Sequence, residues 1–253
     1  MINSFTETPV FVFYYEERTL DFCIFCLEEL GFKNIIIIDG ETPFYEKLIQ
    51  FSRIAHTMSH DFFIRTDADR FIFEGIFDLL KKFTSENIDS CHGYCFDYLM
   101  NAKRGGTPHI YSKNLISKMV SGEIKILNNN KPETHIQQQL KDFRDNKDNY
   151  SRKTFNILTN LHDYEQSRSK IANTFTNRLY RGNKSLYDWS RLRNVGYKEE
   201  VDTAFKYFKD NQVEKDCNYL EIFKKFDKNT KPLTKDLFPE LHQKYLKIYT
   251  EKL

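Results

Sequence analysis

Three short apolar segments, each followed by a helical pattern, constrain the fold more than any other feature of the chain. β-Branched and aromatic residues predominate in residues 9–15, 34–38 and 61–66, and segments of this length and content are typical of buried strands. Helices are expected at residues 16–30, from 43 to about 59, and at 74–83. Because strands and helices alternate, we predict an α/β sheet with right-handed crossovers, whose reactive groups lie at the carboxyl ends of the strands.

The pattern loosens after residue 90. We expect a strand at 91–98, a flexible loop at 103–108 (KRGGTP), a short helix at 111–120, a surface turn at 128–132 and a strand at 155–158. From Ser167 onward the sequence is mostly helical, aromatic and basic. We therefore predict a mixed sheet flanked by helices over residues 1–166 and a mainly helical extension over residues 167–253.

Charge separates these two parts. Residues 1–166 contain 19 Lys and Arg against 24 Asp and Glu, whereas residues 167–253 contain 19 against 12. Two interpretations of the basic extension stay open: it contacts an anionic membrane, or its aromatic residues pack onto the first domain while its lysines face water. The residues concerned are Phe205, Lys206, Tyr207, Phe208, Lys209, Tyr219, Phe223, Lys224, Lys225, Phe226, Lys244, Tyr245, Lys247 and Tyr249.

The sequence shows neither a membrane span nor a secretory signal. No apolar run, including those at residues 9–15 and 34–38, approaches the roughly 20 residues that a spanning helix needs. The opening MINSFTETPVF lacks a basic stretch followed by an apolar one. We therefore expect a cytoplasmic protein, with contact to the inner face of the membrane as the alternative if the basic extension binds lipid.

A pair of carboxylates, Asp67 and Asp69, follows the third predicted strand. Alternation along that strand places Arg65, Asp67 and Asp69 on one face, at the end where reactive groups are expected. Mg²⁺ and Mn²⁺ prefer oxygen ligands and commonly take only one or two from the protein, and Arg65 favours the ionised carboxylates. The alternative is that the two aspartates make a turn and cap the next helix.

The first part of the chain, residues 8–166, resembles the metal-dependent glycosyltransferases of the GT-A fold, which use nucleotide-diphospho-sugars. The resemblance lies in the PVFVFYY strand, an acidic residue after the second strand, a basic residue on the next helix, and the Asp-x-Asp. The first strand departs from the family pattern, because it ends in Tyr-Tyr-Glu-Glu. The resemblance implies that Asp67 and Asp69 bind Mn²⁺ or Mg²⁺. It also implies donor contacts from Tyr14, Tyr15, Asp39, Arg53, Arg65 and Asp67.

The same resemblance extends to the acceptor side of such enzymes. Gly105, Gly106 and His109 correspond to a glycine-bearing segment before a short helix, with an ordinary flexible turn as the alternative. Glu133 corresponds to the catalytic base of inverting members, with a helix cap as the alternative. His162 corresponds to a histidine that often completes the metal site, although a lone histidine also serves as a structural hydrogen-bonding group.

Together these features predict a hexosyltransferase-like enzyme, and a composition that AT-rich codons favour suggests a bacterial one. We expect it to transfer a sugar from a nucleoside diphosphate donor, with a UDP-sugar as the leading candidate, to a hydroxyl of a surface glycan or lipid-linked glycan. One alternative is a non-catalytic sugar- or nucleotide-binding protein on the same fold. Another is a haloacid-dehalogenase-type phosphatase. Phosphatases of that type carry the Asp-x-Asp on the first strand, whereas in this chain it follows the third predicted strand, which argues against this alternative. No nucleic-acid-binding module is recognisable.

Overall fold

In the computed structural model, the chain folds into two compact units. The first comprises residues 1–96 and 103–162, and the second comprises residues 97–102 and 163–253. The structure describes residues 5–15, 17–40, 43–86, 88–97, 99, 102–127, 136, 138–140, 152–162, 164–180, 196–211, 223–229, 231–232, 239–240, 243–244 and 247.

A seven-stranded mixed sheet forms the centre of the first unit. Its strands are β1 (Val10–Phe13), β2 (Ile35–Ile38), β3 (Phe62–Asp67), β4 (Arg70–Ile72), β5 (Ser90–Asp97), β6 (Ala102–Ser112) and β7 (Arg152–His162). They are arranged in the order β2-β1-β3-β6-β5-β7-β4. β1 is parallel to β2 and β3, whereas β6 is antiparallel to β3 and β7 to β4. The predicted mixed sheet flanked by helices is therefore confirmed.

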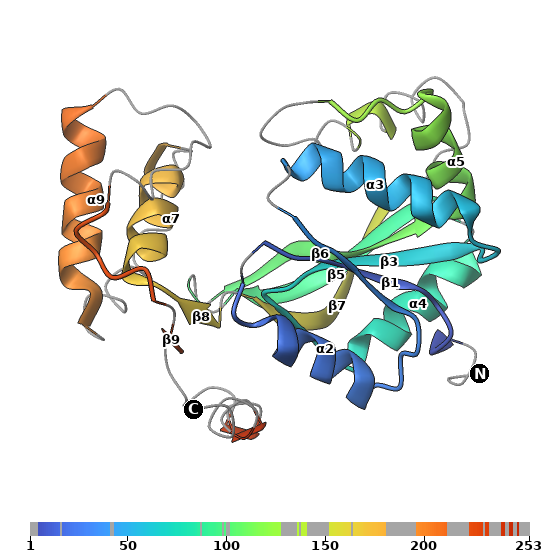
Figure 1. The fold of residues 1–253 in the computed structure, drawn as a ribbon, viewed down its shortest axis with the longest axis horizontal. Helices are drawn as coiled ribbons and strands as arrows, with labels where there is room; N and C mark the ends of the chain where they lie inside the picture. Colours follow the sequence, from blue (N-terminus) through green and yellow to red (C-terminus); the bar gives the residue numbers. More distant parts are fainter. Residues whose placement is uncertain are drawn as a thin grey trace. The chain divides into compact units, whose positions relative to one another are not determined.

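Helices cover both faces of this sheet. α2 (Leu20–Glu29) and α4 (Gly75–Glu86) lie on one face, and α3 (Phe44–Thr57) and α5 (Lys113–Ser121) lie on the other (Figure 1). Two apolar cores result, one around Val10, Val12 and Leu80, and one around Phe11, Phe51 and Phe63. Because β1 contributes alternate residues to the two cores, it is buried on both faces, as its continuous apolar run predicted.

Local sequence signals fix the ends of the helices that precede the site. α2 ends in a Schellman arrangement, in which Gly31 has a φ of 84° and the amide of Phe32 donates to the carbonyl of Leu27. α3 begins directly after Pro43, whose fixed φ suits the start of a helix. Both helices lie within the predicted ranges.

Two local predictions were wrong. β2 was expected to be buried, but it is the first strand of the sheet order, and Ile37 is 42% exposed. Residues 103–108 were expected to form a flexible loop, but they belong to β6. The Gly-Gly pair suits this strand because a Cβ on Gly105 would lie 3.1 Å from Nε2 of His92.

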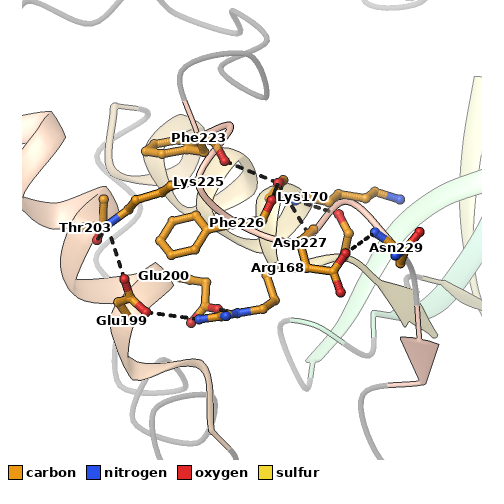
Figure 2. Close-up of polar contacts among 12 residues, drawn as sticks. Arg168, Lys170, Glu199, Glu200, Thr203, Phe223, Lys225, Phe226, Asp227 and Asn229 are labelled. Atoms are coloured by element: carbon orange, nitrogen blue, oxygen red, sulfur yellow. Dashed lines mark hydrogen bonds and ion pairs between the residues drawn. The ribbon is translucent and has the colours of Figure 1, made fainter.

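In the second unit, an ion-pair cluster lies beside a small apolar core. α7 (Arg168–Tyr180) packs on α9 (Lys198–Asp210), and β8 (Glu165–Gln166) pairs with β9 (Lys231–Pro232). Arg168 contacts the fully buried Glu200 and also Glu199, which Lys225 reaches from the other side at 3.2 Å (Figure 2). The guanidinium of Arg168 lies 5.3 Å from the ring centroid of Phe226. The extension is thus mainly helical where it is described.

Several of its aromatic residues pack within this unit. Phe223 and Phe226 are buried against Ala172, with Tyr207 and Phe208 partly buried beside them. Tyr219, Tyr245 and Tyr249 lie outside the described residues. Within the described part of the chain, no helix combines the length and the apolar character needed to cross a bilayer.

Candidate functional site

A short turn between β3 and β4 carries both predicted metal ligands. Asp67 is the last residue of β3, and Asp69 follows in the turn, so Asp69 reaches the site through the turn and not through strand alternation. The backbone of the turn is fixed by its neighbours. The amide of Ala68 donates to the carbonyl of Phe13 at 2.9 Å, and the hydroxyl of Thr19 donates to the carbonyl of Ala68 at 3.0 Å. β1 and α2 therefore hold the turn in place.

The two aspartates line a pocket of about 330 Å³. It lies where β1 and β3 end, because Phe13 and Asp67 are register partners on these parallel strands. This is the edge at which open α/β sheets bind ligands, and the volume lies at the lower end of the range for small-molecule sites. The lining residues are Phe13, Tyr14, Tyr15, Glu17, Phe44, Lys47, Asp67, Asp69 and His162.

Two buried arginines compensate the charge of the aspartates. Arg65, which is 1% exposed, places Nη2 3.5 Å from Oδ1 of Asp67. Arg70, which is 6% exposed, places Nε 3.7 Å from Oδ2 of Asp67 and 3.5 Å from Oδ1 of Asp69. The guanidinium of Arg65 also lies about 5 Å from the ring centroids of Phe13 and Phe44. Each carboxylate therefore has a buried cationic partner on the protein side.

A buried hydrogen-bond network connects Asp67 to β6 and β7. The hydroxyl of Thr107 donates to Oδ2 of Asp67 at 2.9 Å, and the side-chain amide of Asn160 donates to the carbonyl of Thr107 at 2.6 Å. Nη1 of Arg70 lies 3.5 Å from Oδ1 of Asn160, which closes the network. Sequence reasoning missed Thr107 and Asn160. A signal existed only for Asn160, which lies two residues before His162 and therefore on the same face of a strand.

His162 contacts Asp69 and is oriented by Arg104. Nε2 of His162 lies 3.3 Å from Oδ2 of Asp69, and Nη2 of Arg104 lies 2.7 Å from Nδ1 of His162. Because arginine only donates hydrogen bonds, Nδ1 accepts, and the proton of a neutral ring is on Nε2, facing Asp69. In this arrangement His162 orients Asp69 and does not offer a lone pair to a metal.

The oxygen donors nevertheless fit a hard divalent cation. Asp67 and Asp69 are 27% and 18% exposed at their side chains, so both carboxylates reach the pocket. Mg²⁺ and Mn²⁺ often take only one or two protein carboxylates and complete their coordination with phosphate and water. Among the residues that the structure describes, no cluster of three or more His, Cys, Asp or Glu side chains is arranged to hold a metal. The donor set therefore suits a cation that a ligand helps to bind.

Lys47 is a pocket residue that sequence reasoning missed. It projects from α3, is 4% exposed, donates through Nζ to the carbonyl of Tyr14, and lies 5.5 Å from the ring centroid of Tyr15. Burial lowers the pKa of Lys47, whereas the nearby Glu17, Asp39 and Asp67 oppose this shift. Helical spacing would have revealed it, because Lys47 shares its face of α3 with Phe51 and is therefore a lysine at a core position.

Of the other residues predicted to contact the sugar donor, two line the pocket and three do not. Tyr14 and Tyr15 line the pocket, and Tyr15 is 53% exposed. Asp39 follows β2 and is exposed near Lys47, but it does not line the pocket. Arg53 lies on the exposed face of α3, away from the pocket lining. Arg65 is buried beneath Asp67 and is not a lining residue.

The predicted acceptor-side residues do not line this pocket. Gly105 and Gly106 lie in β6, and His109 is 6% exposed beside Arg65, its register partner on β3. Burial lowers the pKa of His109 well below its ordinary value, and the charge of Arg65 acts in the same direction. His109 is therefore a neutral core residue. Glu133 lies outside the described residues.

Comparison with known proteins finds remote structural likeness only. No family model matches the chain, and no curated protein does. The chain is similar to A197 from STIV at a TM-score of 0.36 and 13% identity, over 44% of this chain and 68% of that one. The bifunctional IspDF from Campylobacter jejuni gives a TM-score of 0.41 at 13% identity, over 59% of this chain and 49% of that one.

A third similar structure is a putative glucose-1-phosphate thymidylyltransferase from Bacillus anthracis in complex with a sucrose. It gives a TM-score of 0.35 at 12% identity, over 59% of this chain and 68% of that one. The chain thus spans about half the length of IspDF and about two thirds of the other two proteins. Likeness this remote carries no information about activity.

Proposed function

We propose that this protein is a divalent-metal-assisted glycosyltransferase that binds a nucleotide-sugar in the pocket at the ends of β1 and β3. The observation that carries the proposal is the meeting of Asp67 and Asp69 with Tyr14 and Tyr15 in one pocket. Two carboxylates suit a metal-bound diphosphate, and aromatic rings suit a nucleobase. The pocket also lies at the sheet edge where α/β proteins bind nucleotides.

Asp69 and Asp67 are the residues that would hold Mn²⁺ or Mg²⁺. When bound, the cation would supply Lewis-acid stabilisation of the charge that develops on the leaving diphosphate. The residues of the chain prepare this site. Arg70 contacts both carboxylates, and Thr107 donates a hydrogen bond to one oxygen of Asp67, so the acidic pair is oriented before a ligand arrives.

The pocket walls would position the rest of the donor. Tyr15 offers an exposed ring for a base, and Lys47 holds the Tyr14–Tyr15 segment through the carbonyl of Tyr14. Asp39 does not line the pocket, but it lies close enough to Lys47 to influence the pKa of that lysine, and it is the candidate partner for ribose hydroxyls. Transfer to a glycan hydroxyl also requires a base, and Glu133 remains the residue predicted for that role.

A thermal-shift panel tests this proposal. UDP, GDP, CMP and dTDP sugars are compared with and without Mn²⁺, and a ligand at a hundred times its dissociation constant should add about 2.7 kcal/mol of stability. We expect one nucleotide class to stabilise the protein, and more strongly with Mn²⁺. Asp69→Asn should abolish the Mn²⁺ effect. Asp78→Asn is the control, because Asp78 pairs with Lys81 on the surface of α4.

Chemistry is tested separately, because a non-catalytic binding protein would give the same thermal shifts. The nucleotide-sugar that stabilises the protein best is incubated with it and Mn²⁺, and release of the nucleoside diphosphate is measured. Slow release without an acceptor supports a transferase. Strong binding without release, either alone or with candidate glycan acceptors, would favour a binding protein on this fold.

A further inference from the structure

The acidic pair carries no net negative charge once its buried partners are counted. Asp67 and Asp69 contribute two negative charges, and Arg65 and Arg70 contribute two positive charges within 3.7 Å of them. Arginine does not lose its proton in a protein, so this compensation is permanent. Glu17 and Lys47, which line the same pocket, cancel each other, and Arg104 adds a positive charge at His162.

The burial of the two guanidinium groups makes their charge effective at the pocket. Arg65 and Arg70 are 1% and 6% exposed, so water screens their charges little. They contact the same carboxylates that a cation would approach from the pocket side. A divalent cation that enters alone would therefore gain attraction from two aspartates and lose most of it to repulsion from two arginines.

We propose that Arg65 and Arg70 make metal binding conditional on a phosphate-bearing ligand. This inference rests on the proposed function, because it concerns the same metal and the same pocket. A diphosphate supplies the negative charge that the arginines have cancelled, so the cation binds as a complex with it and hardly at all without it. By linkage, the diphosphate binds more tightly with the cation by the same factor.

Equilibrium dialysis measures this coupling directly. The intact protein is dialysed against sub-saturating Mn²⁺, with and without inorganic pyrophosphate, and the excess of Mn²⁺ in the protein chamber is the bound metal. Pyrophosphate is a probe that does not depend on the identity of the base. We expect pyrophosphate to raise the bound Mn²⁺ by roughly tenfold or more at equal free Mn²⁺. Equal retention with and without pyrophosphate overturns the proposal but leaves the metal site of the proposed function intact.

Variants at Arg70 separate charge from shape. Arg70→Gln should raise the retention of Mn²⁺ alone by roughly tenfold or more, whereas Arg70→Lys, which keeps the charge, should resemble the unmodified protein. Arg53→Gln is the matched control, because the same change is made on the exposed face of α3. Equal Mn²⁺ retention in the Gln and Lys variants at position 70 overturns the proposal. If Arg70→Gln does not fold, the comparison with and without pyrophosphate in the unmodified protein decides.

Failure of the proposed function has a different signature. If Mn²⁺ is retained neither alone nor with pyrophosphate, in the unmodified protein and in every folded variant, then the pocket binds no metal and both proposals fall. Asp69→Asn provides the positive identification of the site, because it should abolish the retention that pyrophosphate induces.

Discussion

Protonation of His92 should destabilise the fold in weak acid. This histidine lies on β5 and is 5% exposed; Nδ1 is 3.3 Å from Nη2 of Arg152, and Nε2 is 3.1 Å from the hydroxyl of Thr154. Because Arg152 can only donate, Nδ1 must accept, and protonation there would place two positive groups together. Burial, followed by the charge of Arg152, lowers the pKa of His92 to about 4.

The size of the effect follows from the two pKa values. In the unfolded chain His92 has its ordinary pKa of 6.5, so below pH 6.5 the unfolded state takes up a proton that the native state refuses until about pH 4. The free energy of unfolding therefore falls as the pH falls through this window. Between pH 7.5 and pH 5 the contribution of His92 amounts to about 2 kcal/mol.

Urea unfolding of the unmodified protein and of His92→Gln, at pH 7.5, 6 and 5, isolates this contribution. The variant has no imidazole to protonate at position 92. The free energy of unfolding of the variant minus that of the unmodified protein should therefore rise by about 2 kcal/mol between pH 7.5 and pH 5. His56→Gln is the control, because His56 is exposed on α3. The difference in the free energy of unfolding between this variant and the unmodified protein should stay constant within about 0.5 kcal/mol. A pH-independent difference for His92→Gln would refute the account of the buried histidine.

Three further predictions concern Lys47 in the pocket, Gly75 in the packing of α4 on β7, and the predicted base Glu133. Lys47→Met should lower the free energy of unfolding by about 1–3 kcal/mol, because it leaves the carbonyl of Tyr14 without its donor. The same substitution should weaken nucleotide binding measured by calorimetry. Lys82→Met, on the exposed face of α4, is the control and should change neither quantity. Gly75→Ala should lower the free energy of unfolding in urea by about 1–3 kcal/mol, because the new Cβ would lie 2.1 Å from the carbonyl oxygen of Leu158 on β7. Ser85→Ala, at an exposed position of the same helix, is the control and should change this free energy little. Glu133→Gln should lower turnover by roughly 10²–10⁴-fold with donor binding intact, and near-normal turnover would return Glu133 to a structural role.

The strands and helices near the site could be predicted because their signals are local. β1, α3 and β3 show continuous apolar runs or helical spacing within a few residues of sequence. The position of β2 could not be predicted, because four isoleucines look alike in a central strand and in an edge strand. β6 was missed because Gly-Gly-Thr-Pro is a turn signal, and contacts with His92 and Asp67, distant in sequence, override it.

At the candidate site, too, local sequence signals could be interpreted, whereas contacts between residues distant in sequence could not. Asp67 and Asp69 could be proposed because a strand end and the spacing of two carboxylates are visible in the sequence. Their partners could not, since Thr107 is 40 residues from Asp67 and Asn160 is 90 residues from Arg70. Arg53 was predicted from the family resemblance and Lys47 was not considered, although the spacing along α3 places Lys47 on the inner face.

The most direct test of the central claim is anomalous scattering from Mn²⁺ in crystals grown with the nucleotide diphosphate that binds best. We expect one anomalous peak in the pocket, in contact with a carboxylate oxygen of Asp69 and with the diphosphate. Asp69→Asn crystals should lose the peak. A diphosphate bound in this pocket without any anomalous peak, or a peak remote from Asp67 and Asp69, would contradict the claim.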